Sequence, residues 1–590
     1  MARRNKRHNI LDFHPSLAAE KWDVIIIGSG ISGLTTAELL AASGKRVLVL
    51  EQHDRAGGAC HNFELEKYEF DVGVHYVSQM KPGTDIFHIC AAVSDSQVKW
   101  KEIPDPLDTI IIGQKRYPRS KGGLESFRKQ LCEMFPPESD NIDAYFKYMY
   151  ACLKEVPWIF RAKFAPVPIV RFLLKTGLFS VFSNIFKNMK RTLLEVMEEY
   201  ELTPDLQTVI SYYFVNYAAP PNRASFLQHS LFFLENGFYP VGGSNSLTSN
   251  IIRSIEKLGG RVLVKANVKR ISIKNDKVDG VFVERRGEES FIPAPMVVST
   301  AALTHVFKDL IPKTVAQKHS DFLLILTVEL KSKLLIYQMA DKLNKSETIK
   351  VGAFQAYIGL DGSQEDLQLP SNNYFWFKTS DVNEFDKYLS LSPEEAVDYG
   401  CPPIIYICFP SAKDPDWHKR HPGVSTCQII TQVNPSWFEE YMDKSGKRTQ
   451  KRMNKEDYTR LKEMIGNTLI DCLIKNFPDI SNRIAYINYS SPLTQQYYMQ
   501  NNHGELYSLT QQVERFLPDV WSELRCKTDI RGLYFSGQDV FFCGVSSAYM
   551  NGLLTASTIL GVDLRKQLRE AVKKQQNYGT SESTEVKENK

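Results

Sequence analysis

Residues 22–51 read WDVIIIGSGISGLTTAELLAASGKRVLVLE, and this stretch decides the fold. The run at 22–27, rich in β-branched residues, is typical of a strand that is buried on both faces. A glycine turn follows, then a helical stretch over 32–42 and a second apolar run over 46–50. A strand, a helix and a strand within about 30 residues predict a parallel sheet with a right-handed crossover.

The turn before this helix carries the pattern G-x-G-x-x-G at Gly28, Gly30 and Gly33. The first glycine permits a tight turn, the second lets the backbone approach a pyrophosphate, and the third allows close packing of helix on strand. The helix N-terminus adds N–H donors and the positive end of its dipole. The pattern therefore predicts a dinucleotide site, to which the intervening Ser29, Ile31 and Ser32 also belong.

Glu51 ends the second strand, where a carboxylate accepts hydrogen bonds from the adenosine ribose and disfavours a 2′-phosphate. FAD or NAD is therefore expected here rather than NADP. Arg55 and the pair Gly57-Gly58 add a second glycine turn that can wrap a flavin diphosphate, with Gln52 beside it. These residues favour FAD as the resident cofactor. NAD and NADP both stay open as the electron donor.

Size and composition narrow the class of protein. A chain of 590 residues exceeds what one hydrophobic core organises, so two or more units are expected. A net charge of +4 is too mild to indicate nucleic-acid binding. The ten cysteines form no C-x-x-C pair, which favours buried thiols in a reducing compartment, and no metal site is expected.

The sequence bears on membranes in two ways. No uncharged apolar run reaches the length of a spanning helix, and the basic N-terminus lacks the apolar core of a secretory signal. The segment 163–191, however, mixes Phe, Leu and Ile with basic residues such as Arg171, Lys175 and Lys187. It fits a helix lying in the membrane interface, as a peripheral attachment, or a helix of a substrate domain with a solvated basic face. Both interpretations stay open.

Three segments link the chain to a known family: EQHDRAGGACHNF (51–63), FDVGVHY (70–76) and GLYFSGQDVFFCG (532–544). With the glycine pattern they resemble the retinol saturase family, part of the carotenoid desaturase and isomerase group of two-dinucleotide-binding flavoproteins. The resemblance extends from about residue 22 to 565. It implies an FAD-dependent oxidoreductase acting on a CH–CH group, which converts all-trans-retinol to all-trans-13,14-dihydroretinol. It also implies a peripheral address at the endoplasmic reticulum membrane.

The same resemblance implies further site residues. A short strand around Val268 would reach the adenine, and the closing motif would bring Gly537 and Asp539 to the ribityl chain or the phosphates. His75 follows a turn where such proteins lay the chain along the flavin, so it could place or relay a proton. A structural histidine bonded to the backbone is the alternative. Rigid aromatic rings suit the walls of a polyene tunnel or ordinary core packing; the candidates are Tyr212, Tyr213, Tyr497, Tyr498 and Tyr507.

The nucleotide pieces are interleaved with the rest of the chain, which predicts an α/β fold whose Rossmann-like FAD-binding domain is assembled from discontinuous segments, with an α+β substrate domain. The expected ranges are an N-terminal extension (1–20), the FAD-binding domain (21–100, 236–305 and 500–565), the substrate domain (101–235 and 306–499) and a disordered tail (566–590).

Two other functions compete with retinoid reduction. A carotenoid desaturase or cis-trans isomerase would use the same flavin site with a hydrophobic polyene as substrate. A prenyl-binding escort protein resembling Rab GDP-dissociation inhibitors would share the fold without redox chemistry, but in those proteins the dinucleotide glycines are typically degraded. Here Gly28, Gly30 and Gly33 all stand. The oligomeric state stays open.

Overall fold

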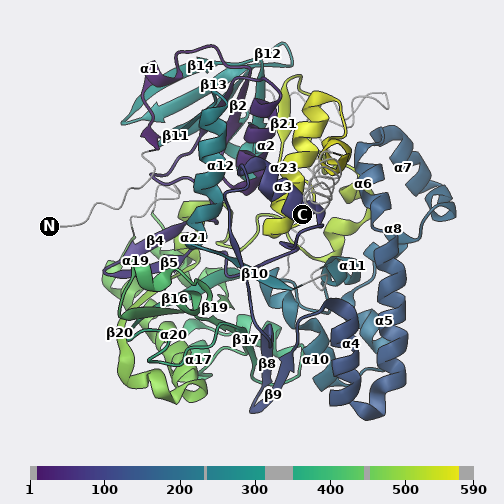
Figure 1. Cartoon of the computed structure of the whole chain (residues 1–590), viewed down its shortest axis with the longest axis vertical. Coiled ribbons are helices and arrows are strands. Elements are labelled where there is room, and N and C mark those ends of the chain that lie inside the picture. Colours follow the sequence, from purple (N-terminus) through teal and green to yellow (C-terminus); the bar gives the residue numbers. More distant parts are fainter. Residues whose placement is uncertain (1–9, 232–235, 313–349, 444–451, 571–590) are drawn as a thin grey trace, which may run out of the picture.

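The computed structural model describes residues 10–231, 236–312, 350–443 and 452–570. Figure 1 shows three regions: a parallel sheet with its helices at the top, a larger sheet at the lower left, and a group of helices along the right-hand side. The arrangement confirms the predicted class, a Rossmann-like α/β unit combined with an α+β region.

The parallel sheet forms around the strand–helix–strand unit predicted from residues 22–51. Its strand order is β1-β11-β3-β2-β15-β21, and every neighbouring pair is parallel. The strands are β1 (Leu11–Asp12), β2 (Val24–Ile27), β3 (Val47–Leu50), β11 (Arg261–Val264), β15 (Met296–Ser299) and β21 (Leu533–Phe535). Distant parts of the sequence thus meet in one sheet, whose central strands β2 and β3 are fully buried.

Helices cover one face of this sheet and a small antiparallel sheet accompanies the other (Figure 1). The crossover helix α2 (Ile31–Ala42) packs against α12 (Asn245–Lys257) and α23 (Val545–Leu560). Gly552 of α23 permits this close approach, because a Cβ there would lie 2.6 Å from the Cβ of Thr35. The antiparallel sheet consists of β12 (Asn267–Lys274), β13 (Lys277–Arg285) and β14 (Glu288–Pro293).

The larger sheet has seven strands in the order β20-β16-β19-β18-β17-β8-β9. Only the pair β17–β8 is parallel; the other neighbours are antiparallel. The strands are β8 (Asp108–Ile112), β9 (Lys115–Arg119), β16 (Gly352–Asp361), β17 (Asn373–Phe377), β18 (Ile404–Cys408), β19 (Val424–Val433) and β20 (Ile484–Ser490). β8, β17 and β18 are buried along their whole length, so this sheet carries core on both faces.

Two small sheets lie between the large ones. β6 (Val77–Ser78), β10 (Gly237–Pro240) and β7 (Trp100–Glu102) form one, and the hairpin of β4 (Asn62–Leu65) and β5 (Tyr68–Asp71) forms the other. Asp71 ties the hairpin to β10 and to the chain after it, because its carboxylate accepts from Tyr239 Oη at 2.6 Å and Ser244 Oγ at 2.7 Å. The segment that runs on from β5 through His75 is thereby held between the two large sheets.

The helical region contains α4 (Gly123–Met134), α5 (Ser139–Lys154), α6 (Pro157–Phe164), α7 (Val167–Lys175), α8 (Ile185–Met189), α9 (Leu193–Glu199), α10 (Pro204–Ser211) and α11 (Phe226–Ser230). The expectation of one helix over 163–191 is wrong. Pro166 precedes α7 and Gly177, with a φ of 72°, follows it, so the segment folds as short helices joined by turns.

The described ends also differ from expectation. Leu11–Asp12, placed by sequence in an N-terminal extension, adds an edge strand parallel to β11. Residues 564–570, placed partly in a disordered tail, are helical, and Arg569 forms an ion pair with Asp85 of α3 (Asp85–Val93). Residues 571–590 lie outside the described ranges.

Candidate functional site

The glycine turn after β2 has the geometry that its sequence pattern predicts. Gly28 has a φ of 97°, and a Cβ there would lie 2.4 Å from Thr300 Oγ1. A Cβ at Gly33 would lie 2.4 Å from the carbonyl oxygen of Gly28. A side chain at Gly28 would clash with Thr300, and one at Gly33 would force α2 away from the turn, so both glycines are required for packing.

Gly30 differs from its two neighbours in the pattern. A Cβ at Gly30 would meet no atom within 4 Å, so the space in front of this residue is open. Gly30 is also the N-cap of α2, and within the described residues no side chain caps the helix. The first N–H groups of α2 therefore face open space beside a positive helix end, which fits a bound diphosphate.

A buried network fixes the loop around this space. Ser29 donates to Oε2 of Glu51 through its backbone N–H at 3.2 Å and its hydroxyl at 2.6 Å. The Ser29 hydroxyl in turn accepts from the N–H of Gly57 at 2.9 Å. Oε1 of Glu51 accepts from the N–H of His53 at 3.0 Å. Oε2 thus accepts two hydrogen bonds and Oε1 accepts one, so Glu51 can orient the loop and still receive a ribose hydroxyl at Oε1.

The second glycine turn lies directly against the first. A Cβ at Gly58 would lie 3.1 Å from Gly30 Cα, so the two turns border the same space. Arg55 anchors this turn by donating from Nη1 to the Asn62 carbonyl oxygen at 2.8 Å, and Gln52 is half-buried. The predicted diphosphate residues are therefore brought together.

The strand predicted to reach the adenine begins beside Glu51. The N–H of Ala266 donates to the Glu51 carbonyl oxygen at 2.7 Å, and two residues later Val268 is buried in β12. Tyr497 and Tyr498 lie at this end too, with ring centroids 5.5 and 5.2 Å from that of His53. Their packing on His53 places them beside the nucleotide loop rather than with the other candidate tunnel tyrosines.

The C-terminal motif closes the site from the far edge of the sheet. Ser536 Oγ lies 2.8 Å from Ser32 Oγ in the first turn of α2, and Gly537 follows with a φ of 104°. Asp539 is buried and accepts from the N–H of Leu303 at 2.9 Å and from the Ser508 hydroxyl. The carboxylate of Asp539 thus holds neighbouring loops together; its contact with the flavin stays a prediction.

Two residues outside the glycine motifs also fix this region. Arg515 is fully buried and donates to the carbonyl oxygens of Gln538 and Phe541, which fixes the loop after Gly537. Thr300 packs on both Gly28 and Gly33, and its hydroxyl donates to the Ile27 carbonyl oxygen at 2.9 Å. Neither residue lies in a glycine motif, so only the folded chain shows their role.

His75 lies between the nucleotide region and the seven-stranded sheet. Its side chain is 8% exposed, and neither ring nitrogen has a hydrogen-bond partner among the described residues. The ring packs on Tyr406 of β18 at a centroid distance of 5.5 Å. Burial, together with the charge of Lys413, lowers the pKa of His75 to about 3. The imidazole is therefore neutral near pH 7 and holds no imidazolium proton to deliver.

A buried polar cluster, the Asp108 cluster, lies on the sheet side of His75. The carboxylate of Asp108 accepts from Tyr212 Oη at 2.7 Å, Tyr213 Oη at 2.9 Å, Asn373 Nδ2 at 2.9 Å and Arg119 Nη1 at 3.4 Å. Asn373 links this group to Lys413, whose Nζ also donates to the His75 carbonyl oxygen at 2.9 Å.

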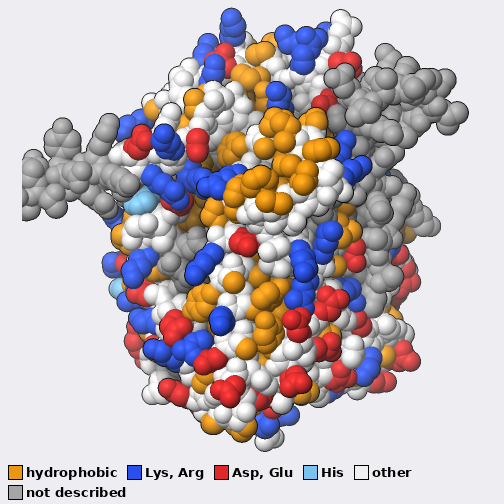
Figure 2. Space-filling view, turned by 90° about the vertical axis from the view of Figure 1, so that its right-hand side faces the viewer, with side chains coloured by type: hydrophobic (Ala, Val, Ile, Leu, Met, Phe, Trp, Pro, Cys, Tyr) orange, Lys and Arg blue, Asp and Glu red, His pale blue; other side chains and the backbone are white. Residues whose placement is uncertain are grey.

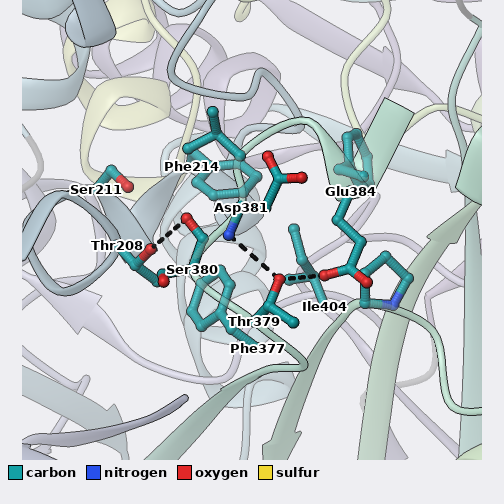
Figure 3. A pocket seen from close by; sticks show the side chains of 12 residues that line it. Thr208, Ser211, Phe214, Phe377, Thr379, Ser380, Asp381, Glu384 and Ile404 are labelled. Atoms are coloured by element: carbon teal, nitrogen blue, oxygen red, sulfur yellow. Dashed lines mark hydrogen bonds between the residues drawn. The ribbon is translucent and has the colours of Figure 1, made fainter. Parts of the chain in front are cut away.

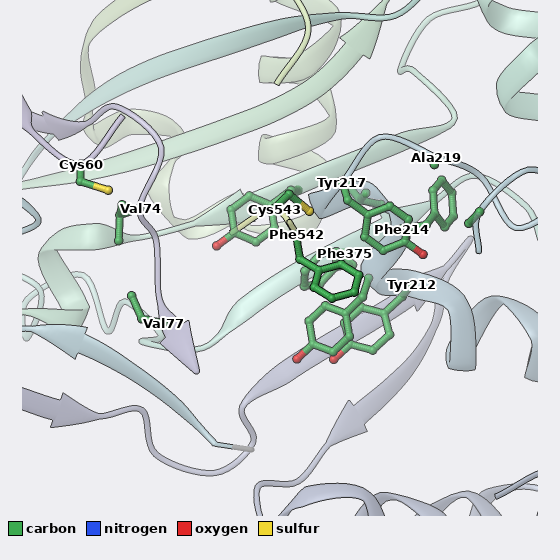
Figure 4. Packing of buried hydrophobic residues seen from close by; sticks show 14 of the residues in the cluster. Cys60, Val74, Val77, Tyr212, Phe214, Tyr217, Ala219, Phe375, Phe542 and Cys543 are labelled. Carbon is green, nitrogen blue, oxygen red and sulfur yellow. The ribbon is translucent and has the colours of Figure 1, made fainter. Parts of the chain in front are cut away.

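These polar groups are occupied with one another, so Tyr212 and Tyr213 present their rings rather than free hydroxyls to the apolar core. Figure 4 shows this core, with Cys60 and Val74 from the nucleotide side, Phe542 and Cys543 from the C-terminal motif, and Tyr212 and Phe375 from the sheet side. The arrangement supplies an aromatic, water-excluding environment next to the dinucleotide region.

A separate small cavity lies behind α10 and β17 (Figure 3). It is lined by Ser211, Phe214, Thr379, Asp381 and neighbouring side chains, and its volume of about 20 Å³ holds roughly one water molecule. It is too small for a polyene or a cofactor and has no part in the site described above.

Comparisons with known proteins agree with this geometry. Residues 26–93 match the family model described as "NAD(P)-binding Rossmann-like domain". Over 580 residues, covering 97% of this chain and 91% of the relative, the chain is 33% identical to "All-trans-retinol 13,14-reductase" of Danio rerio. It is 32% identical over 550 residues (91% of this chain, 85% of the relative) to a second Danio rerio protein, named "Inactive all-trans-retinol 13,14-reductase".

More distant similarities place the fold in a wider group. The chain is 22% identical over 587 residues to "Prolycopene isomerase, chloroplastic" of Daucus carota, covering 94% of this chain and 83% of that one. A solved structure of putrescine oxidase has a TM-score of 0.57 at 13% identity, covering 92% of this chain and 99% of that one. At this identity the structural likeness shows the fold alone.

Proposed function

Because the chain belongs to the all-trans-retinol 13,14-reductase family, we propose that it saturates the 13,14 double bond of all-trans-retinol with FAD as its resident cofactor. The observation that carries the proposal is the open space before Gly30, bordered by Gly58 and facing the uncapped start of α2. Gly28 and Gly33 let the turn, Thr300 and α2 pack closely behind this space.

The residues of the chain would bind and orient both reactants. The glycine turns and Glu51 would hold FAD, which when bound supplies the hydride for an unactivated double bond. The aromatic core of Tyr212, Phe375 and Phe542 would align the polyene and exclude water. Neutral His75 has no imidazolium proton to give, and its predicted role in placing or relaying a proton stays a prediction.

The reaction has a direct assay. Lysate containing the protein, supplied with all-trans-retinol and either NADH or NADPH, should yield a product two mass units heavier whose absorption lies at shorter wavelength. The shift is expected because the terminal double bond leaves the conjugated system. An unchanged retinol pool with both donors, in protein that carries FAD, would contradict the proposal and would resemble the behaviour implied by the name of the inactive Danio rerio relative.

The second candidate function is carotenoid isomerisation or desaturation, favoured by the similarity to carrot prolycopene isomerase over nearly the whole chain. It would use the same cofactor and a longer polyene. Incubation with a poly-cis carotenoid and with phytoene, followed by chromatography, separates this function from retinol reduction. Turnover of either carotenoid without turnover of retinol would favour it.

We further propose that the protein meets its lipid-soluble substrate at a membrane surface, through an exposed apolar patch. No helix in the four described ranges combines the length and apolar character needed to cross a membrane. Large apolar side chains nevertheless gather on α6, α7 and the turn that follows, with Val181 77% and Phe172 58% exposed. The other members of this α6–α7 patch are Phe164, Ile169, Leu178 and Phe182. Figure 2 shows the side of the molecule that carries these helices, with hydrophobic side chains gathered in its upper half and basic ones on either side.

Part of the basic charge predicted for this segment is not available to lipid. Lys163 is buried and donates from Nζ to the carbonyl oxygens of Trp521 and Leu524, and Arg171 forms an ion pair with Glu523. Lys175 and Lys187 are exposed and can meet anionic lipid. Peripheral attachment through apolar side chains, assisted by these lysines, is therefore the proposed mode, and an endoplasmic reticulum address remains a proposal from family resemblance.

A flotation experiment with anionic liposomes tests the patch. Replacing Phe172, Val181 and Phe182 by Ser should abolish recovery with the vesicles, because each of these side chains is more than half exposed and contributes through apolar burial. A matched control replaces exposed apolar residues elsewhere, Leu258 and Phe291, by Ser. The control variant should float like wild type. If the triple variant floats as well as the control variant, the proposal is contradicted.

A further inference from the structure

We propose that His75 binds the hydroxyl group of the substrate and so selects a retinoid alcohol over a polyene hydrocarbon. This inference rests on the proposed function and extends it from the reaction to the recognition of the polar end of the substrate. His75 is assigned as a residue that positions the substrate, not as an acid or a base.

The hydroxyl group of the substrate lies close to the double bond that is reduced. In all-trans-retinol a single carbon, C15, separates the 13,14 double bond from the hydroxyl oxygen. A site that reduces this bond therefore buries the hydroxyl group at the reacting end of the polyene, within the same water-excluding core. A buried hydroxyl without a hydrogen-bond partner is costly, so the protein must provide one there.

The neighbours of His75 come from the nucleotide side and from the seven-stranded sheet. His75 follows the Gly73 turn and is flanked by Val74, which packs in the apolar core with Cys60 and Cys543 (Figure 4). Its other neighbours belong to the seven-stranded sheet: the ring contacts Tyr406, and the carbonyl oxygen accepts from Lys413. His75 thus lies at the boundary between the nucleotide side and the substrate side.

The ring nitrogens of His75 are available to a ligand. Both ring nitrogens of His75 are buried, and neither has a partner among the described residues. A neutral imidazole presents one donor and one acceptor, and an alcohol can pair with either. The polar groups of the Asp108 cluster nearby already bond to one another, since Asp108, Asn373 and Lys413 each have a partner inside the cluster. A new hydroxyl would compete with those bonds, whereas at His75 it would pair with a ring nitrogen that has no other partner among the described residues.

Gln228 of α11 is one competing residue. Its Nε2 donates to Cys543 Sγ at 3.2 Å, while Oε1 is buried and has no partner among the described residues. It keeps an acceptor and the second N–H of its amide group, so it too could bind the alcohol. A variant of Gln228 is therefore the matched control for a variant of His75.

The test measures equilibrium binding to the oxidised, FAD-loaded protein, so it needs no turnover. The ligands are all-trans-retinol and the hydrocarbon in which a methyl group replaces its CH₂OH group. Wild type should bind the alcohol about 10- to 100-fold more tightly, the range expected when a buried hydrogen bond is lost and its partner is left unpaired.

His75→Phe should reduce this preference to nearly one while FAD content stays unchanged, and Gln228→Met should keep it. His75→Gln, which retains a donor and an acceptor, should restore part of it. If the phenylalanine ring does not allow folding, His75→Met gives the same comparison.

An unchanged preference in His75→Phe or His75→Met would overturn the inference, as would loss of FAD, which would assign His75 to the cofactor. Loss of the preference in Gln228→Met alone would overturn it in favour of Gln228. Protein that shows the His75-dependent preference but does not reduce retinol would contradict the proposed reaction and leave the hydroxyl site standing.

Discussion

Substituting alanine at Gly30 and, separately, at Gly33 should produce two different defects, although both glycines belong to one motif. A Cβ at Gly30 meets nothing within 4 Å, and the backbone there has φ −63°, which alanine adopts without strain. Gly30→Ala should therefore fold with a loss of at most about 1 kcal/mol, the cost of a poorer N-cap. Its methyl group instead occupies the space of the diphosphate.

The size of the binding defect follows from the contacts at that position. Displacing the diphosphate from the start of α2 loses at least one charge-assisted hydrogen bond, worth roughly 1.5–3 kcal/mol. FAD affinity should therefore fall by about 10- to 100-fold or more.

Gly33→Ala acts on packing. The new Cβ would lie 2.4 Å from the Gly28 carbonyl oxygen and 3.2 Å from Thr300 Cγ2, so the helix must move from the strand. Overpacking of this kind costs about 1–3 kcal/mol, which should appear as a lower unfolding temperature of the protein freed of FAD.

The assay compares thermal unfolding without FAD and FAD titration of each variant at one temperature. Gly30→Ala should unfold like wild type and bind FAD weakly. Gly33→Ala should unfold earlier even without FAD. Tight FAD binding by folded Gly30→Ala would refute the placement of the diphosphate, and normal stability of Gly33→Ala would refute the packing argument.

Two further variants test other parts of the site and the electrostatics. Glu51→Ala removes the acceptor of Ser29 and His53 and the predicted ribose contact, so its activity should fall but recover as FAD is added to the assay; activity that stays low at saturating FAD would contradict a cofactor role. Glu38 on α2 is buried, and burial raises its pKa to about 7, so in the unfolded chain it loses its proton at lower pH than in the folded one. The stability conferred by protonated Glu38 is therefore complete below about pH 4 and lost as the pH rises through 7. Glu38→Gln should raise the unfolding free energy at pH 8, by up to about 3 kcal/mol, and change it little at pH 4; an equal effect at both pH values would contradict the assignment.

The sequence predicted the nucleotide loop well because its constraints are local. Gly28, Gly33 and Glu51 occupy positions set by two strands, one turn and one helix, so their spacing alone encodes their geometry. The same reasoning placed the strands at 22–27 and 46–50 correctly within two residues.

Other features depend on contacts between distant segments and could not be read from spacing. The burial of Lys163 depends on carbonyl groups more than 350 residues away in the chain. The Asp108 cluster joins β8 and β17 to the turn after α10, which turned two predicted tunnel tyrosines into members of a polar network. The segment 163–191 does not form one helix because Pro166, Pro168 and Gly177 interrupt it, which its mixture of apolar and basic residues does not reveal.

The most direct test of the central claim is an anaerobic single turnover. Purified protein loaded with FAD is reduced, freed of excess reductant and mixed with all-trans-retinol, while the flavin absorption and the mass of the retinoid are followed together. We expect one flavin to be reoxidised for each retinol converted to a product two mass units heavier. Flavin that stays reduced while retinol stays intact, in protein that acts on a poly-cis carotenoid under the same conditions, would contradict the claim.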